Sequence, residues 1–388
     1  MIVKPMVRSN VCLNAHPEGM KLHVQEQIDY VKKQKKFDGP KNVLIIGGSA
    51  GYGIATRIAA SFGGGAKTIS VAFEKPASEK RGATVGWYAS EYFKKKAEEE
   101  GLFAQNIYGD AFSRELKDET IAAVKKNFGK ADLVVYSLAS GVRTDPATGV
   151  MYRSVLKPLG KTYTAKSVNP MTGELTDVSI EPANEEEVAA TVKVMGGEDW
   201  ELWIDALLKA DVLAQGAVTL AYSYIGPEIT QAVYREGTIG KAKEHIEAGA
   251  KTLDKKMKAI GGAAYISVNK AVVTRASAVI PVVPLYTGIL FKILEAKGLQ
   301  ENCAAQMYRM FTERLCTGKP IPTDPEGRIR LDDREMREDV QKEVSGIWGK
   351  ITQENAAEYA DFKAYETEFL QLHGFGYPQI DYDKDVEV

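Results

Sequence analysis

Two side chains within one short stretch of the chain, Tyr234 and Lys243, could together deliver a proton to a substrate. A tyrosine loses its proton near pH ~10 when unperturbed, and a neighbouring positive charge favours the phenolate. Far upstream, the run from Gly47 to Gly53 is rich in glycine, as is typical of loops that hold a dinucleotide. A tyrosine and a lysine placed beside a bound hydride donor would be a workable acid at neutral pH.

The spacing of this pair makes a demand on the local structure. Lys243 follows Tyr234 by nine positions, and on a continuous α-helix that is roughly 900°, so the two side chains would point apart. Gly237 and Gly240 could interrupt the helix, and Thr238 is a suitable N-cap for a new one. We therefore expect a helix break between the two residues.

Lys241 is an alternative partner for Tyr234. At seven positions it lies about 20° from being in phase on an unbroken helix, so the spacing alone leaves both lysines open. The same pair could also arise by chance in a chain with 18 tyrosines, with Tyr234 a core residue and the lysines part of a solvated helix face. The pair gains specificity only from its position after a fifth strand in a fold that has a glycine loop.

The glycine loop lies between an apolar run at 43–46, predicted to be a buried strand, and a predicted helix over 54–60. Such a loop lets backbone N–H groups approach a pyrophosphate, and the helix dipole adds to the attraction. The spacing Gly47-x3-Gly51-x-Gly53 resembles that of the short-chain dehydrogenases/reductases. The predicted cofactor-binding residues of the loop are Gly47, Gly48, Ser49, Ala50, Gly51, Tyr52 and Gly53.

The second strand, predicted over 68–73, is followed by Glu74. A carboxylate there could accept hydrogen bonds from both ribose hydroxyls of the adenosine half and would repel a 2′-phosphate, which favours NADH over NADPH. Lys75, Lys80 and Arg81 lie close enough in sequence to weaken that preference. Further predicted cofactor contacts at strand ends are Phe73, Asp110 and Ala111 near the adenine half, and Leu138 and Ala139 near the ribose.

Apolar runs alternate with amphipathic stretches from about residue 40 onward, which indicates βαβ units around a parallel sheet. We predict an α/β fold with a doubly wound parallel sheet, a Rossmann fold like that of the short-chain dehydrogenases/reductases, with N-terminal, central and C-terminal elaborations. Further strands are expected at 103–108, 133–137, 218–222 and 264–268, and helices at 19–36, 91–100 and 115–126. One large domain over 1–388 would comprise a cofactor half (39–140), an insertion (141–216) ending in a helix around 194–200, a catalytic half (217–298) and a helical extension (299–388).

Composition excludes several classes of protein. The 388 residues carry a net charge of -2, which argues against a general nucleic-acid or anionic-membrane surface. Three scattered cysteines and four histidines form no disulfide framework and no metal-ligand spacing, so a reducing cytoplasm is expected. No signal peptide is evident, and the most apolar stretch, 276–286, is too short to span a bilayer.

The chain resembles the bacterial trans-2-enoyl-CoA reductases and their close kin, the type V enoyl-acyl-carrier-protein reductases, nearly end to end. The motifs that carry this resemblance are His16-Pro17, Gly47 to Gly53, Val85-Gly86-Trp87-Tyr88, Gly109-Asp110-Ala111-Phe112, Tyr136-Ser137-Leu138-Ala139, Lys193-Val194-Met195-Gly196-Gly197-Glu198-Asp199-Trp200, Ala221-Tyr222-Ser223-Tyr224-Ile225-Gly226, Ser267-Val268-Asn269-Lys270 and Ile280-Pro281-Val282-Val283-Pro284-Leu285-Tyr286. In that family Tyr-x8-Lys is the catalytic signature, which matches Tyr234 and Lys243 rather than Lys241. The resemblance also implies that Tyr224 contacts the substrate thioester.

The resemblance implies NADH-dependent reduction of a trans-2-enoyl thioester, carried by CoA or by acyl-carrier protein, of the type that converts crotonyl-CoA to butyryl-CoA. Tyr234 and Tyr224 would donate to the developing enolate oxygen, while Lys243 would bind the nicotinamide ribose and hold the tyrosine pKa down. Val272, Val273 and Thr274 would meet the carboxamide end of the cofactor, and an apolar helix over 276–286 could form one wall of the acyl pocket. The chain is expected to be a monomer or weak dimer.

Two other classes of function remain open. A carbonyl reductase acting on 3-ketoacyl thioesters or alcohols usually has a serine about a dozen residues before the tyrosine, and Ser223 is near that distance. A non-catalytic dinucleotide sensor would keep the glycine loop but would not need Tyr224, Tyr234 and Lys243 together. A flavin enzyme also remains open, although no separate flavin signature is present.

Overall fold

The computed structural model describes residues 1–8, 10–79, 81–169 and 171–388. Its centre is a seven-stranded sheet, parallel throughout, in the order β13-β12-β11-β6-β3-β4-β5. These strands are β3 (Asn42–Ile46), β4 (Lys67–Ala72), β5 (Ala104–Tyr108), β6 (Ala131–Tyr136), β11 (Leu213–Ser223), β12 (Ala263–Val268) and β13 (Arg328–Arg330). The predicted doubly wound fold is confirmed, and every predicted strand is present.

The middle of the sheet consists of β-branched and leucine residues that are buried on both faces. Val43, Leu44, Ile45 and Ile46 are fully buried, as expected for a parallel strand covered by helices. β3 pairs with β4 on one side and with β6 on the other, so the winding direction reverses there. In open α/β sheets a ligand binds beside the carboxyl ends of the strands at such a reversal.

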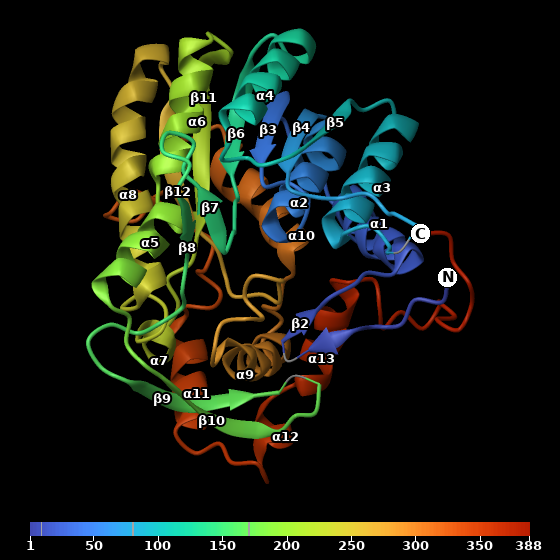
Figure 1. Cartoon of the computed structure of the whole chain (residues 1–388), viewed down its shortest axis with the longest axis vertical. Helices are drawn as coiled ribbons and strands as arrows, with labels where there is room; N and C mark the ends of the chain where they lie inside the picture. Colours follow the sequence, from blue (N-terminus) through green and yellow to red (C-terminus); the bar gives the residue numbers. More distant parts are fainter. Residues whose placement is uncertain (9, 80, 170) are drawn as a thin grey trace.

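Helices cover both faces of the sheet (Figure 1). One face is packed by α1 (Pro17–Lys33), α2 (Gly51–Ile58), α3 (Val85–Glu99) and α10 (Cys303–Met310), and the other by α4 (Arg114–Asn127), α6 (Glu198–Lys209) and α8 (Thr238–Met257). α1 shows why they pack: Met20, Val24, Ile28 and Val31 recur every three or four residues and are all buried. Burial of each such side chain contributes about 1.5–3 kcal/mol.

The insertion forms two β-hairpins and two helices. The hairpins pair β7 (Val142–Thr144) with β8 (Met151–Arg153) and β9 (Tyr163–Val168) with β10 (Leu175–Ile180), and α5 (Glu185–Met195) follows. The predicted helix through 194–200 is wrong, because α5 ends before Gly196 and α6 begins after Gly197. A β-carbon on Gly196 would lie 2.4 Å from the Val192 carbonyl oxygen, so the chain turns there.

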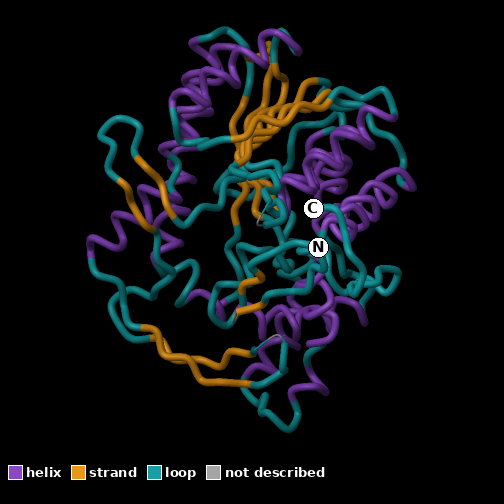
Figure 2. Tube along the Cα trace, turned by 45° about the vertical axis from the view of Figure 1, so that its right-hand side comes forward, coloured by secondary structure: helices purple, strands orange, loops and turns teal. Residues whose placement is uncertain are grey.

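A smaller group of elements lies beyond the carboxyl ends of the strands, in the lower half of Figure 1, and is separated from the sheet by loops in the turned view of Figure 2. It includes the β9–β10 hairpin, which packs on the central helix α9 (Val283–Ala296), together with α11 (Glu338–Trp348), α12 (Ala356–Tyr359) and α13 (Phe362–Gln371). The short strands β1 (Val7–Arg8) and β2 (Val11–Cys12) pair beside α13. The remaining helices are α7 (Glu228–Gln231) and three short irregular ones at Ala59–Gly63, Lys258–Ile260 and Phe311–Leu315.

The helix predicted over 276–286 lies later in the chain than expected, at Val283–Ala296. Residues 275–282 form turns, and α9 begins only at Val283, because Val282 adopts a left-handed backbone (φ 65°) and Pro284 fits the first turn of a helix. Within the part of the chain that the structure describes, no helix is both long and apolar enough to cross a membrane.

Candidate active site

The glycine loop joins β3 to α2 at the point where the sheet reverses. Gly47 (φ 90°) and Gly51 (φ 51°) have left-handed backbones that favour glycine. A β-carbon would lie 2.5 Å from the Ser137 carbonyl oxygen at Gly47, and 2.0 Å from the Gly47 carbonyl oxygen at Gly53. Ala50 precedes α2 and offers no side-chain cap, so the first N–H groups of that helix are left for a ligand.

Glu74 is held against this loop. The Ser49 hydroxyl donates to Glu74 Oε1 at 2.8 Å, and a β-carbon on Gly86 would lie only 2.1 Å from the same oxygen. Phe73 beside it is 69% exposed, and its ring lies 5.7 Å from Lys75 Nζ. Lys80, one of the cations expected to weaken the NADH preference, lies outside the described residues.

The other residues predicted to contact the cofactor at strand ends differ in their exposure to solvent. Asp110 Oδ1 accepts from the Phe112 N–H at 2.9 Å. Ala111 is buried, and its carbonyl accepts from Lys117 Nζ and from the Trp203 ring N–H. Leu138 is partly buried and Ala139 is exposed, and both follow Ser137, whose carbonyl lies against Gly47.

The loop after β12 approaches the glycine loop from the other side. A β-carbon on Gly51 would lie 3.6 Å from Thr274 Cγ2, and the Tyr52 hydroxyl donates to the Lys270 carbonyl at 2.5 Å. Val272 and Val273 of this loop are buried. The structure therefore brings the predicted residues of two distant segments together at the carboxyl ends of the strands.

The expected helix break between Tyr234 and Lys243 is present. α7 ends at Gln231, Tyr234 lies in the turns that follow, and α8 begins at Thr238 with Gly237 as its N-cap. Thr238 is thus the first helical residue and not the predicted N-cap; its hydroxyl donates to the Val155 carbonyl at 2.5 Å. Lys243 consequently lies in the second turn of a new helix.

The two candidate lysines point in different directions from α8. Lys243 is partly buried, and its Nζ donates to the Tyr222 carbonyl at the end of β11, 3.4 Å away. Burial lowers the pKa of Lys243 to about 8. Lys241 is exposed and pairs with Glu244 at 2.9 Å. Only Lys243 reaches the sheet edge where the glycine loop lies.

The two candidate tyrosines contact each other. The rings of Tyr224 and Tyr234 meet edge to face, with their centroids 4.9 Å apart. Burial raises the pKa of Tyr234, which is opposite to the direction expected for a phenolate and keeps the phenol neutral. Among the described residues no hydrogen bond joins Tyr234 to Lys243, while the Tyr224 hydroxyl lies 2.8 Å from Glu335 Oε1.

Some contacts at this edge were not predicted. Glu335 and Tyr286 bind each other beside Tyr224, and Tyr222 lies between Lys243 and the ring of Tyr52. Ser223, the serine that a carbonyl reductase would use, has a buried hydroxyl without a partner among the described residues. It offers no open face to a substrate.

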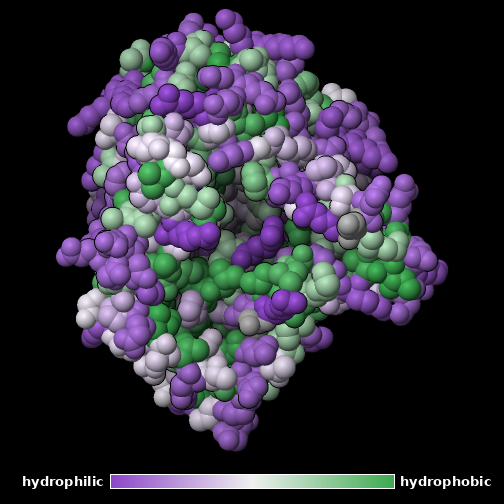
Figure 3. All heavy atoms as spheres, in the orientation of Figure 1, coloured by the Kyte–Doolittle hydropathy of each residue, from purple (hydrophilic) through white to green (hydrophobic). Residues whose placement is uncertain are grey.

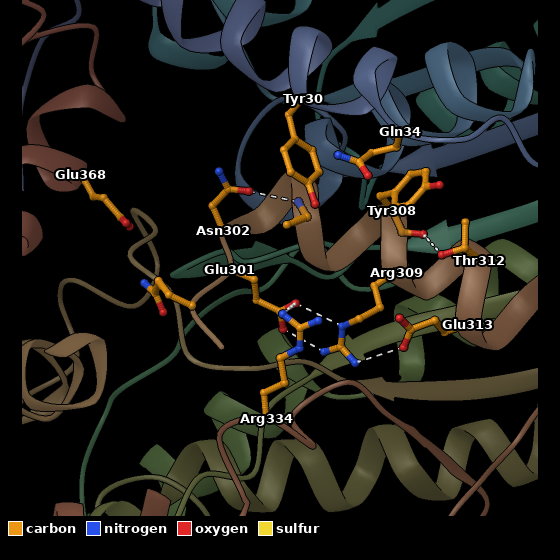
Figure 4. Close-up of a pocket in the computed structure, with 12 residues that line it drawn as sticks. Tyr30, Gln34, Glu301, Asn302, Tyr308, Arg309, Thr312, Glu313, Arg334 and Glu368 are labelled. Carbon is orange, nitrogen blue, oxygen red and sulfur yellow. Dashed lines mark hydrogen bonds and ion pairs between the residues drawn. The ribbon is translucent and has the colours of Figure 1, made fainter. Parts of the chain in front are cut away.

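The hollow visible in the centre of Figure 3 lies between the sheet and the lower group of elements, with apolar side chains along its lower border. A separate cavity of about 460 Å³ is lined by none of the predicted site residues (Figure 4). Both of its arginines pair with carboxylates, Arg309 with Glu301 at 2.8 Å and Arg334 with Glu301 at 3.3 Å.

A doubly wound sheet with a glycine loop at its reversal and a Tyr–Lys pair beyond β11 defines a dinucleotide-dependent oxidoreductase. Family models described as "Trans-2-enoyl-CoA reductase catalytic region" and "NAD(P)H binding domain of trans-2-enoyl-CoA reductase" match residues 81–316 and 2–79. The chain belongs to the trans-2-enoyl-CoA reductase family, whose cofactor is NADH, and the predicted family and cofactor are confirmed.

Relatives match over the whole length. The chain is 56% identical to the trans-2-enoyl-CoA reductase [NADH] of Treponema denticola, covering 100% of this chain and 99% of that one. It is 53% identical to the enoyl-[acyl-carrier-protein] reductase [NADH] of Cytophaga hutchinsonii, covering 100% and 98%. The crystal structure of the Clostridium acetobutulicum trans-2-enoyl-CoA reductase in complex with NADH superimposes with a TM-score of 0.97 at 46% identity, covering 100% and 98%.

A third family model, described as "Enoyl reductase FAD binding domain", matches residues 323–386. The residues of this segment do not fit a flavin dinucleotide. Its strand β13 is followed by a charged turn and not by a glycine loop. Its cations Arg328, Arg330 and Arg334 pair with carboxylates, and its apolar residues Val340 and Val344 pack against α9. A flavin therefore has no part in the chemistry of this site.

Proposed function

We propose that Tyr234, Tyr224 and Lys243 are the catalytic residues with which this chain reduces the carbon–carbon double bond of trans-2-enoyl thioesters, with NADH as the reductant. The observation that carries this assignment is the edge-to-face contact of the two tyrosines beside the end of β11. Lys243 also contacts the end of this strand, through the Tyr222 carbonyl. NADH, when bound, supplies the hydride for the β-carbon of the substrate. The protein must then stabilise the negative charge that develops on the thioester oxygen.

Tyr234 is proposed as the proton donor. Its phenol is neutral because burial raises its pKa, and no described residue takes its hydroxyl proton, so that proton can be donated to the enolate. Tyr224 is proposed as a second hydroxyl donor at the same oxygen. Lys243 is proposed to bind the nicotinamide ribose, since its ammonium already occupies the edge of the sheet beside the Tyr222 carbonyl.

The proposed cofactor site follows the glycine loop. The N–H groups at the start of α2 would hold the pyrophosphate. Glu74, held by the Ser49 hydroxyl in the space that Gly86 leaves, would accept from the adenosine ribose hydroxyls. Phe73, Asp110, Ala111, Leu138 and Ala139 are proposed to surround the adenosine half, and Val272, Val273 and Thr274 the carboxamide end. Fixing Glu74 in place makes its repulsion of a 2′-phosphate effective.

The chain is further proposed to act in the cytoplasm as a monomer built from a single large domain. Cys12, Cys303 and Cys316 are free thiols, in keeping with a reducing compartment. An acyl thioester of either CoA or acyl-carrier protein would present the same reacting group to the tyrosines.

The test compares two thioesters of equal chain length. Consumption of NADH should be rapid with crotonyl-CoA, which carries the double bond, and slow with acetoacetyl-CoA, which carries a ketone. The buried hydroxyl of Ser223 supports this preference. Faster reduction of acetoacetyl-CoA would instead support a carbonyl reductase and contradict the proposed chemistry.

A further inference from the structure

Glu335 belongs to the C-terminal segment and is preceded by a run of charged residues, yet it is completely buried. Its Oε1 lies 2.8 Å from the Tyr224 hydroxyl and 2.6 Å from the Tyr286 hydroxyl. Its Oε2 accepts from the Ala271 N–H at 2.6 Å. One carboxyl group therefore joins the loop after β12, helix α9 and the tyrosine proposed to contact the thioester.

The number of protons in this network limits what Tyr224 can do. A phenol has a single O–H, whereas an ionised carboxylate can only accept. If Glu335 is ionised, the protons of both Tyr224 and Tyr286 are donated to it. Tyr224 then has no proton left for a developing enolate oxygen.

A neutral Glu335 gives a different arrangement. Its Oε1–H donates to the Tyr224 oxygen, and the same Oε1 accepts from Tyr286. The Tyr286 oxygen in turn accepts from Gln341 Nε2 at 3.2 Å, and Oε2 still accepts from Ala271. Only the Tyr224 proton then has no acceptor among the described residues, so it is free to point at the substrate.

The charges around Glu335 are compatible with the neutral form. Lys270 is the cation that faces it, but this ammonium also faces Glu301 and Glu368 and donates to the Ala271 carbonyl at 2.8 Å. Burial is the largest influence on the pKa of Glu335 and raises it, outweighing the hydrogen bonds from Tyr286 and Ala271 and the charge of Lys270.

We propose that Glu335 works as a neutral carboxylic acid and is the positioning residue that directs the Tyr224 hydroxyl proton toward the thioester oxygen. This inference rests on the role proposed above for Tyr224. It also gives the segment 323–386 a part in the active site that involves no flavin. Glu335 itself acts only through Tyr224.

Glu335→Gln tests this directly, because the surroundings fix the orientation of the new amide. Ala271 N–H needs an acceptor, so the amide oxygen faces Ala271 and the NH₂ group faces the tyrosines. Toward Tyr224 the amide therefore imitates the neutral acid, because its N–H donates and it cannot ionise. Toward Tyr286 the NH₂ group can only donate, so the Tyr286 hydroxyl loses its acceptor. Tyr286→Phe is the matched control, because it removes one hydrogen bond to the same carboxyl group and leaves the Tyr224 side chain in place.

The measurements are kcat and KM for crotonyl-CoA at saturating NADH across pH, with thermal unfolding of every variant. Wild type and Tyr286→Phe should lose kcat/KM as pH rises through the range where Glu335 ionises, since the Tyr224 proton returns to the carboxylate. Glu335→Gln should stay within about threefold of wild type at neutral pH and lack that decline. Tyr224→Phe should be at least about tenfold slower and also lack it.

Each other outcome has a definite meaning. If Glu335→Gln falls to the level of Tyr224→Phe while remaining folded, the ionised carboxylate is required and the inference is wrong. If Glu335→Gln matches wild type in both rate and pH profile, Glu335 has only a structural role. If Tyr224→Phe is as active as wild type, the role proposed for Tyr224 fails first, and this is distinguishable from failure of the Glu335 inference alone.

Discussion

Replacing Lys243 by methionine should nearly abolish turnover and weaken NADH binding. The ammonium is proposed to make charge-assisted hydrogen bonds to two ribose hydroxyls, each contributing about 1.5–3 kcal/mol. Losing both costs roughly 3–6 kcal/mol, and every 1.4 kcal/mol is about tenfold, so kcat/KM should fall by on the order of 10²- to 10⁴-fold. Methionine keeps the unbranched apolar stem that packs in this partly buried position.

Lys241→Met is the matched control on the same helix. Lys241 is exposed, and its ion pair with Glu244 spans three residues of α8. Such pairs contribute about 0.2–0.5 kcal/mol, so Lys241→Met should retain activity within about threefold. Kinetics with crotonyl-CoA and a direct NADH titration would measure both effects. An inactive Lys241→Met beside an active Lys243→Met would refute the geometry and transfer the role to the shorter spacing.

The pH dependence of NADH binding gives a second test of Lys243. Its pKa in the cofactor-free protein is about 8, so NADH affinity should fall as pH rises through that value, and Lys243→Met should lack the fall. Stability should move the other way. The unfolded state keeps the lysine proton up to pH ~10.4, so between about 8 and ~10.4 it binds more protons than the folded state and stability rises with pH.

Four further outcomes are expected. Tyr234→Phe should lower kcat by about 10²- to 10³-fold with NADH affinity unchanged, because its hydroxyl acts on the developing enolate. Glu74→Ser should improve kcat/KM with NADPH and narrow the preference for NADH; a wild-type preference for NADPH would contradict the role of Glu74. Light scattering should show a monomer or weak dimer, and a stable tetramer at low concentration would exclude it. Lys117→Met should cost about 3–5 kcal/mol in urea unfolding because it strands the buried carboxylate of Asp199, whereas Lys130→Met, which removes an exposed pair, should cost under about 1 kcal/mol.

The central sheet was predictable because its strands carry their own signal. Val43 to Ile46 and the runs at 133–137 and 264–268 are apolar and bounded by turns, and a parallel strand buried on both faces must have that composition. β13 has no such signal: it is only three residues long, it contains two arginines, and it pairs only with β12 at the edge of the sheet. β13 is therefore a strand because it pairs with β12, and not because of its own composition.

The insertion was not predictable in detail for a related reason. β9 and β10 carry polar residues on their open sides, and only a few of their residues, such as Val168, are buried against α9. At the helix boundary the Val192 carbonyl approaches Gly196 so closely that a β-carbon would not fit, a local requirement that hydrophobic periodicity does not register. Hydrophobic periodicity indicates which face of a regular helix or strand is buried, and it predicts less well where few residues are buried.

Some residues of the candidate site could be predicted from the sequence and others could not. Tyr234 and Lys243 could be named from the sequence, but their spacing alone left Lys241 open and only the family resemblance favoured Lys243. The backbone break at Gly237 gives the physical reason, since it places Lys243 inside and Lys241 outside. Glu335 has no sequence signal at all, since it follows Asp333 and Arg334 in a run that resembles a solvated turn. Its burial comes from α9 and the loop after β12, which cover it from distant parts of the chain. A carboxyl group that acts through Tyr224 can therefore be found only from the packed structure, and in this chain it lies in the segment that resembles a flavin domain and does not fit a flavin.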